Sequence, residues 1–146
     1  MDDLEFQLKT LIETEWNLAD PKPLFHRNKR RLEGGLDETN IIVADVTDIN
    51  NWTNEGTADC LALLQVSVRV PSAGTTTEEI EKAKLSKHGI REEIYRIIEA
   101  VDDGTIDKPD GWEWCHVTRR NNQDNFDSPK PSMGEDLNVT VAYQRT

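Results

Sequence analysis

Apolar positions near the start of the chain follow the 3.6-residue period of an amphipathic helix. They recur at spacings of three and four residues, at Leu4, Leu8, Leu11, Ile12 and Trp16. Asp2 is placed to cap this helix, with Glu5 three residues further on. Pro21 disfavours helical backbone in the residue before it. The pattern predicts an opening helix that ends before residue 21.

Two β-branched runs follow. Residues 41–46 read as a strand, and residues 60–70 alternate strictly. The first set of alternating positions comprises Cys60, Ala62, Leu64, Val66, Val68 and Val70. Leu61 and Leu63 make the first half of this strand apolar on both faces, so we expect that half to be covered on both sides.

A second helix is predicted from residue 76 or 77 to residue 101. Thr76 and Glu79 form a capping-box pattern at its start, and Asp102-Asp103-Gly104 stops it. Its apolar stripe consists of Ile80, Ala83, Ile90, Ile94, Ile97, Ile98 and Val101.

The chain closes with two predicted strands, residues 112–119 and 137–144, joined by a polar loop over 121–136. Trp112 and Trp114 are two residues apart on the first of them. This spacing predicts that they share one face, packed in the core or, as the alternative, at a subunit seam.

These elements predict an α+β fold in the order α-β-β-α-β-β. We expect a mostly antiparallel sheet of about four strands with two helices packed on it, in one domain over residues 1–146. Extended polar arms are expected at 26–40 and 121–136.

The composition and net charge disfavour some classes of function. Among 146 residues, 17 are basic and 28 acidic, which gives a net charge of −11, and the apolar share is 36%. A field of this sign repels a phosphate backbone, which disfavours sequence-independent binding of DNA over the whole surface. The low apolar share suggests that neighbouring copies complete part of the hydrophobic surface, although solvated loops would lower it too.

No cofactor is expected. Cys60 and Cys115 lie far apart and match no metal-site spacing, so we expect two buried free thiols. The N-terminus lacks the pattern of a signal peptide, and no apolar stretch is long enough to span a membrane. We therefore expect a soluble protein that is cytoplasmic before any assembly.

The sequence also offers no catalytic candidate. His26, His88 and His116 lie on three separate elements, and the acidic run after residue 101 lacks the ligand spacing of an EF-hand. Phosphate-loop, dinucleotide, nucleophile-elbow and zinc-protease motifs are absent from the sequence.

One cluster of positive charge stands out in this acidic chain, at residues 26–31. It reads as a solvated loop, as a contact for acidic surface on a neighbouring subunit, or as a local phosphate contact. The 121–136 loop has little apolar content, and long loops of this kind are often binding elements. The hypothetical interface residues are Arg27, Lys29, Arg30, Arg31, Phe126, Lys130 and Met133.

The layout resembles the tail terminator (tail completion, or neck) proteins of long-tailed viruses of bacteria and archaea. The likeness lies in the length, the element order and the closing strand pair, with Trp16-Asn17 and Asp20-Pro21 after the first helix and the run 94–98, Ile-Tyr-Arg-Ile-Ile, in the second. The resemblance implies a ring, typically of six copies, that caps the tail tube, stops its polymerisation and docks it to the head connector. DNA would pass through the lumen without specific binding. It also implies location in the virion tail or neck, after assembly in the host cytoplasm, and no catalytic residues.

Other functions remain open. A tail-tube or secretion-apparatus subunit of related fold would stack into long polymers instead of stopping at a ring. An acidic inhibitor that mimics DNA needs carboxylates spaced like phosphates, whereas lysines interrupt the acidic run of the second helix at Lys82 and Lys84. A small enzyme with an unrecognised site is the fourth possibility.

Overall fold

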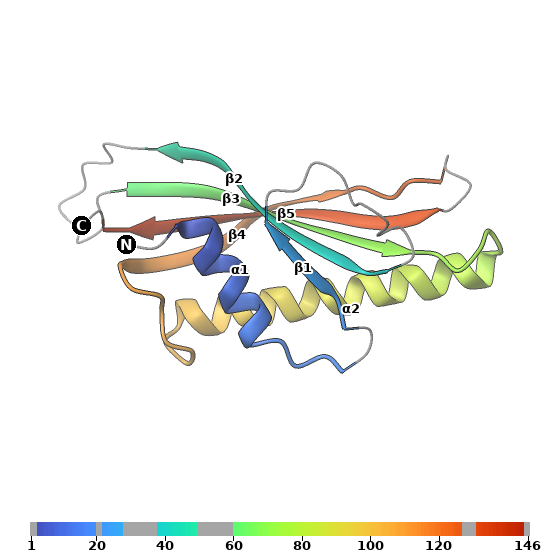
Figure 1. Ribbon diagram of the computed structural model, residues 1–146, viewed down its shortest axis with the longest axis horizontal. Helices are drawn as coiled ribbons and strands as arrows, with labels where there is room; N and C mark the ends of the chain where they lie inside the picture. Colours follow the sequence, from blue (N-terminus) through green and yellow to red (C-terminus); the bar gives the residue numbers. More distant parts are fainter. Residues whose placement is uncertain (1–2, 20–21, 28–37, 50–59, 127–130, 145–146) are drawn as a thin grey trace.

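The computed structural model describes residues 3–19, 22–27, 38–49, 60–126 and 131–144. Along these segments the elements are α1 (Leu4–Thr14), β1 (Leu24–Arg27), β2 (Asn40–Ile49), β3 (Cys60–Pro71), α2 (Thr77–Asp102), β4 (Trp112–Asn122) and β5 (Ser132–Tyr143). The strands form one sheet, and α2 runs along its length with α1 beside it (Figure 1).

The sheet has five strands in the order β1-β2-β3-β5-β4. β1 pairs with β2 in parallel, and the other three neighbouring pairs are antiparallel. The predicted α+β class and its two helices are therefore confirmed. The sheet is mixed, so the expected mostly antiparallel sheet of about four strands and its element order differ in detail from the structure. The difference arises because β1, which overlaps the expected polar arm only at residues 26–27, was not predicted as a strand.

Both helices pack on the same face of the sheet. In β3, every second residue from Cys60 to Val70 is buried and the residues between them are half-buried. The buried set meets Leu8 and Ile12 of α1 and the apolar stripe of α2 in one core cluster. We call this side the helix face and the opposite side the open face. On the open face, residues such as Leu61 and Leu63 are half-buried, and neither helix of the described segments covers them.

The caps explain where the helices begin and end. The Asp3 side chain accepts a hydrogen bond from the Glu5 amide, so α1 is capped one residue later than predicted, and it ends at Thr14, well before Pro21. The predicted capping box of Thr76 and Glu79 at the start of α2 is confirmed. Gly104, just beyond the end of α2, has φ +87°, a left-handed conformation that favours glycine.

The last two strands are longer than predicted. β4 continues to Asn122 and β5 begins at Ser132, so most of the expected 121–136 arm is strand or is tied to it through a bridge between Asn125 and Ser132. Residues 127–130 lie outside the described part of the chain. The first half of β5 was not predicted as strand because its residues are mostly polar.

Trp112 and Trp114 do not share a face. A register shift between them places Trp112 opposite Tyr143 and Trp114 opposite Ala142. Trp112 is buried on the helix face, where its Nε1 donates to Gln7 Oε1 of α1 at 2.9 Å. Trp114 lies on the open face beside His116, with ring centroids 5.0 Å apart. The bulge at residue 113 breaks the two-residue period on which the prediction depended.

Candidate assembly surface

Arg27, the first predicted interface cation, is engaged within its own chain. It lies at the end of β1, where its Nη2 is 2.7 Å from Asp3 Oδ2 and its Nε is 3.1 Å from Glu5 Oε1. Its guanidinium also lies over the Phe6 ring, 5.5 Å from the centroid. Arg27 therefore helps to fasten α1 to the sheet, contrary to the expectation of a free basic arm. Lys29, Arg30 and Arg31 lie outside the described residues.

The hypothetical contacts of the second arm separate into different environments. Phe126 is exposed, with the Lys84 ammonium 5.7 Å from its ring centroid. Met133 is fully buried against the core, so it cannot meet a partner as had been expected. Lys130 lies outside the described residues. Among these three positions, Phe126 alone is shown at the surface.

A buried ion pair holds the connection between β4 and β5 against α2. Lys87 Nζ lies 2.9 Å from Asp124 Oδ1, and the same oxygen accepts a hydrogen bond from the Gly134 amide at 2.9 Å. Burial opposes ionisation of Asp124, but the bonds from Lys87 and Gly134 outweigh it, and the pKa of Asp124 lies below its usual value. The sequence pattern missed this pair because its residues are 37 positions apart.

A second charged group surrounds the buried carboxylate of Glu135 on the helix face. Arg91 Nη1 of α2 lies 3.4 Å from Glu135 Oε2, and Arg120 Nε of β4 lies 3.1 Å from Oε1. Arg120 remains about half exposed at the outer edge of the sheet. No local sequence signal could reveal this group, because its residues come from three elements.

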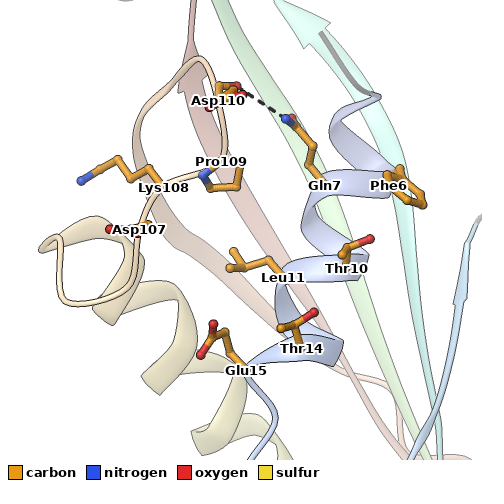
Figure 2. A pocket seen from close by; sticks show the side chains of 10 residues that line it. All are labelled: Phe6, Gln7, Thr10, Leu11, Thr14, Glu15, Asp107, Lys108, Pro109 and Asp110. Carbon is orange, nitrogen blue, oxygen red and sulfur yellow. Dashed lines mark hydrogen bonds between the residues drawn. The ribbon is translucent and has the colours of Figure 1, made fainter.

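An open groove lies between α1 and the loop before β4. Figure 2 shows Phe6, Leu11 and Glu15 on its α1 side and Asp107 and Pro109 on the other. The Gln7 side chain spans it, with Nε2 donating to the Asp110 carbonyl at 3.5 Å. The groove has a volume of about 610 Å³. Its lining combines apolar side chains such as Leu11 with polar ones such as Gln7 and Asp110.

The described residues contain no cluster of three or more His, Cys, Asp or Glu that could hold a metal ion. Cys60 and Cys115 are both buried, and no disulfide joins them, as predicted. Burial and, to a lesser degree, the nearby Asp102 carboxylate raise the pKa of Cys115 to about 12, so this thiol stays protonated at neutral pH and is a poor nucleophile. No helix within the described segments is long and apolar enough to cross a membrane.

Two helix carboxylates bind backbone amides near the two edges of the sheet. Glu5 Oε2 of α1 accepts from the Asp45 amide of β2 at 3.1 Å, at a position that β1 no longer covers. Asp102 Oδ1, at the end of α2, accepts from the Cys115 amide of β4 at 3.2 Å. Beyond Cys115, the outer edge of β4 is exposed and basic, with His116, Arg119 and Arg120 at the surface. This edge and the open face are the surfaces that the described residues leave for a partner.

No protein-family model matches this chain. No characterised protein shows significant sequence similarity to it.

Proposed function

We propose that this chain is a structural protein of a virion, acting at the head–tail junction. In this role it forms a ring, with six copies as the expected number, that ends the tail tube and docks it to the head connector. DNA passes through the lumen without specific binding. The protein assembles in the host cytoplasm, stays in the tail or neck of the particle, and has no catalytic centre of its own.

The observation that carries the proposal is the one-sided sheet. Both helices cover one face, whereas the open face carries the half-buried apolar side chains of Leu61, Leu63 and Trp114. Such a surface gains free energy when a second protein covers it. The groups described above suit contact between proteins better than they suit a reaction, since neither the groove nor the charged clusters converge on a substrate-sized site.

The charge distribution is also consistent with a ring around DNA. The chain carries a net charge of −11, and α2 has Glu78 and Glu79 in its first turn and ends at Asp102. An acidic lumen would repel passing DNA and keep it from adhering. The structural role therefore needs no specific nucleic-acid site.

Electron microscopy of the purified protein tests this proposal. We expect closed rings of uniform diameter, either alone or on the ends of tail tubes. Long stacked tubes would favour the alternative, a tail-tube subunit of related fold. Dispersed particles of single-chain size, both alone and with tube ends present, would contradict the ring.

A further inference from the structure

The outer edge of β4 is the last strand edge of the sheet, and β4 bonds to β5 on its other side. The chain is described without a break along β4 and up to Phe126, and most side chains from His116 to Asn122 are exposed. No strand of the described chain pairs with this edge. Such an edge presents a row of amides and carbonyls to which an extended segment of another chain can add.

The hydrogen-bond pattern shows which amides of this edge point outward. The Gln123 amide bonds inward to the Gly134 carbonyl at 2.8 Å. Amides alternate in direction along a regular stretch of strand, and the pairing with β5 is regular back to the register shift that follows Val117. The amides of Asn122 and Arg120 therefore point away from β5, toward the side on which a strand could add.

Arg120 also shares a hollow with α2. The hollow has a volume of about 470 Å³, and its lining includes Arg120 of β4 and Glu92, Tyr95 and Glu99 of α2. The Tyr95 ring packs against the core and is half-buried, so it offers apolar surface there. The Arg120 side chain is fixed on the helix face by Glu135, with Nε 3.1 Å from Oε1. A residue paired with Arg120 in an added strand would place its side chain on that same face, toward the hollow.

The side of this edge that belongs to the open face is cationic. Arg119 lies opposite Asn138 and is exposed, and none of the ion pairs within the described segments includes it. Residues 116–122, His-Val-Thr-Arg-Arg-Asn-Asn, contain no carboxylate. A cationic edge with a bulge discourages pairing with an arbitrary strand. It favours a strand that brings carboxylates to Arg119.

We infer that the outer edge of β4 is a docking site for an extended segment of a partner protein, which adds as an antiparallel strand along residues 117–122. Antiparallel pairs are the more stable arrangement per residue. The segment alternates apolar side chains, directed to Tyr95 on the helix face, with carboxylates directed to Arg119 on the open face. Pairing of two β4 edges from two copies would instead bring like charges together. The inference needs only the fold of one copy and does not depend on the proposed ring.

Fluorescence anisotropy of two labelled peptides with the full chain tests the chemistry of the partner. Glutamate alternates with valine in one peptide, and lysine replaces glutamate in the other. The net charge of −11 favours the lysine peptide over the whole surface, so a preference for glutamate indicates a local cationic site. We expect the glutamate peptide to bind about tenfold more tightly. Equal binding, or tighter binding of the lysine peptide, would overturn the inference.

A single substitution then locates the preference on β4. Arg119→Ala should remove most of the preference for glutamate, because it removes the cation that faces the carboxylates. Lys82→Ala, which removes another exposed cation at the start of α2, is the matched control and should leave the preference unchanged. Equal effects of the two substitutions would show that the peptide binds elsewhere.

A matched pair of substitutions tests the backbone pairing. Arg120→Pro removes both the outward amide and the guanidinium, whereas Arg120→Ala removes the guanidinium alone. Proline is tolerated on an edge strand when its nitrogen faces outward, so the β4–β5 ladder should persist, and equal melting temperatures would establish this. We expect Arg120→Pro to bind the glutamate peptide about tenfold more weakly than Arg120→Ala does. Equal affinities would contradict strand addition.

N-methylated peptides test the same pairing on the unaltered protein. In an antiparallel pair opposite Arg120, the peptide amides that face β4 belong to the valines. Methylation of the valine amides should abolish binding, whereas methylation of the glutamate amides should leave it intact. Equal effects would contradict the antiparallel strand. If neither peptide bound and Arg120→Pro reduced self-association in sedimentation velocity, the edge would belong to a second copy, which would also overturn the inference.

Discussion

Near each edge of the sheet, a helix carboxylate accepts a hydrogen bond from a backbone amide of the adjacent strand. The two carboxylates differ in how deeply they are buried. On the β2 side, the Glu5 side chain is 8% exposed, and its carboxylate binds both the Asp45 amide and Arg27. On the β4 side, the Asp102 side chain is 28% exposed and binds the Cys115 amide, with His116 Nδ1 at 3.5 Å. Because a buried acceptor cannot be replaced by water, the first contact holds the fold together more strongly. The β2 side is therefore held more firmly to its helix than the β4 side.

A further buried carboxylate, that of Glu93, helps to hold α1 to α2. Glu93 of α2 binds Arg96 at 2.7 Å and accepts from the Asn17 amide at 2.6 Å, just beyond the end of α1. Arg96 also donates to the Glu15 carbonyl at 2.9 Å. The start of α1 is thus held to β2 through Glu5, and the chain after it is held to α2 through Glu93 and Arg96.

We expect the largest loss of stability when Glu5, the more buried of the two compared carboxylates, is removed. Glu5→Ala removes the buried carboxylate that accepts from the Asp45 amide and from Arg27, which keeps its exposed contact with Asp3, and we expect it to lower the free energy of unfolding by about 2–3 kcal/mol. Urea denaturation monitored by circular dichroism measures the change. Glu13→Ala is the matched control, since its ion pair with Lys9 is exposed and the expected loss is below about 0.5 kcal/mol. Equal losses in the two variants would contradict the assigned role of Glu5.

We expect an intermediate loss of stability when Glu93 is replaced. The pH dependence of stability provides a second measurement of its role. The hydrogen bond from Arg96 outweighs burial and holds the pKa of Glu93 below its usual value. A carboxylate with a depressed pKa in the folded state stabilises the fold above its unfolded pKa, and that stability is lost as the pH falls. Asp124 contributes in the same direction.

We therefore expect wild-type stability to fall below about pH 4. Glu93→Gln should cost about 1–2 kcal/mol at pH 7, because it removes the charge of a buried carboxylate that binds Arg96 and the Asn17 amide, and should reduce the loss between pH 4 and pH 2. Denaturant midpoints across this range measure both effects. An acid dependence identical to that of the wild type would show that Glu93 carries none of it.

The smallest expected effect is at Asp102. Asp102→Ala removes the acceptor of the Cys115 amide, but water can reach this site and the lost charge had opposed the dipole at the end of α2. We expect a cost of about 1 kcal/mol or less. Loss of the carboxylate should also lower the pKa of Cys115, so alkylation of Cys115, followed by mass spectrometry of its peptide, should become faster. A cost as large as that of Glu5→Ala would remove the contrast between the two sides.

Much of the fold could be predicted from local patterns. The alternation of β3 and the capping box of α2 depend on neighbouring residues, and both were found. β1 was missed because it has only four residues and pairs in parallel with a strand that begins at Asn40, beyond the range of a local pattern. The start of β5 was missed because Glu135 and Asp136 look like loop residues until Arg91, Arg120 and Arg69 are placed beside them.

The candidate surface was harder to predict than the fold. Sequence identified Arg27 as a free cation, but Asp3 and Glu5 neutralise it across a turn of α1. Met133 reads as a loop anchor, and only the register with Val70 places it in the core. The exposed basic edge of β4 depends on the strand order, because a strand becomes an edge only when the whole sheet is known.

The most direct test of the account is the native mass of the wild-type protein, measured by light scattering on a sizing column at low and high salt. Six copies of 16.7 kDa predict a particle of about 100 kDa. High salt should preserve or increase the assembled fraction, because it screens the repulsion between acidic copies. A 16.7 kDa species at every salt concentration, with tail-tube ends present as well as absent, would contradict the claim that this protein works by assembly.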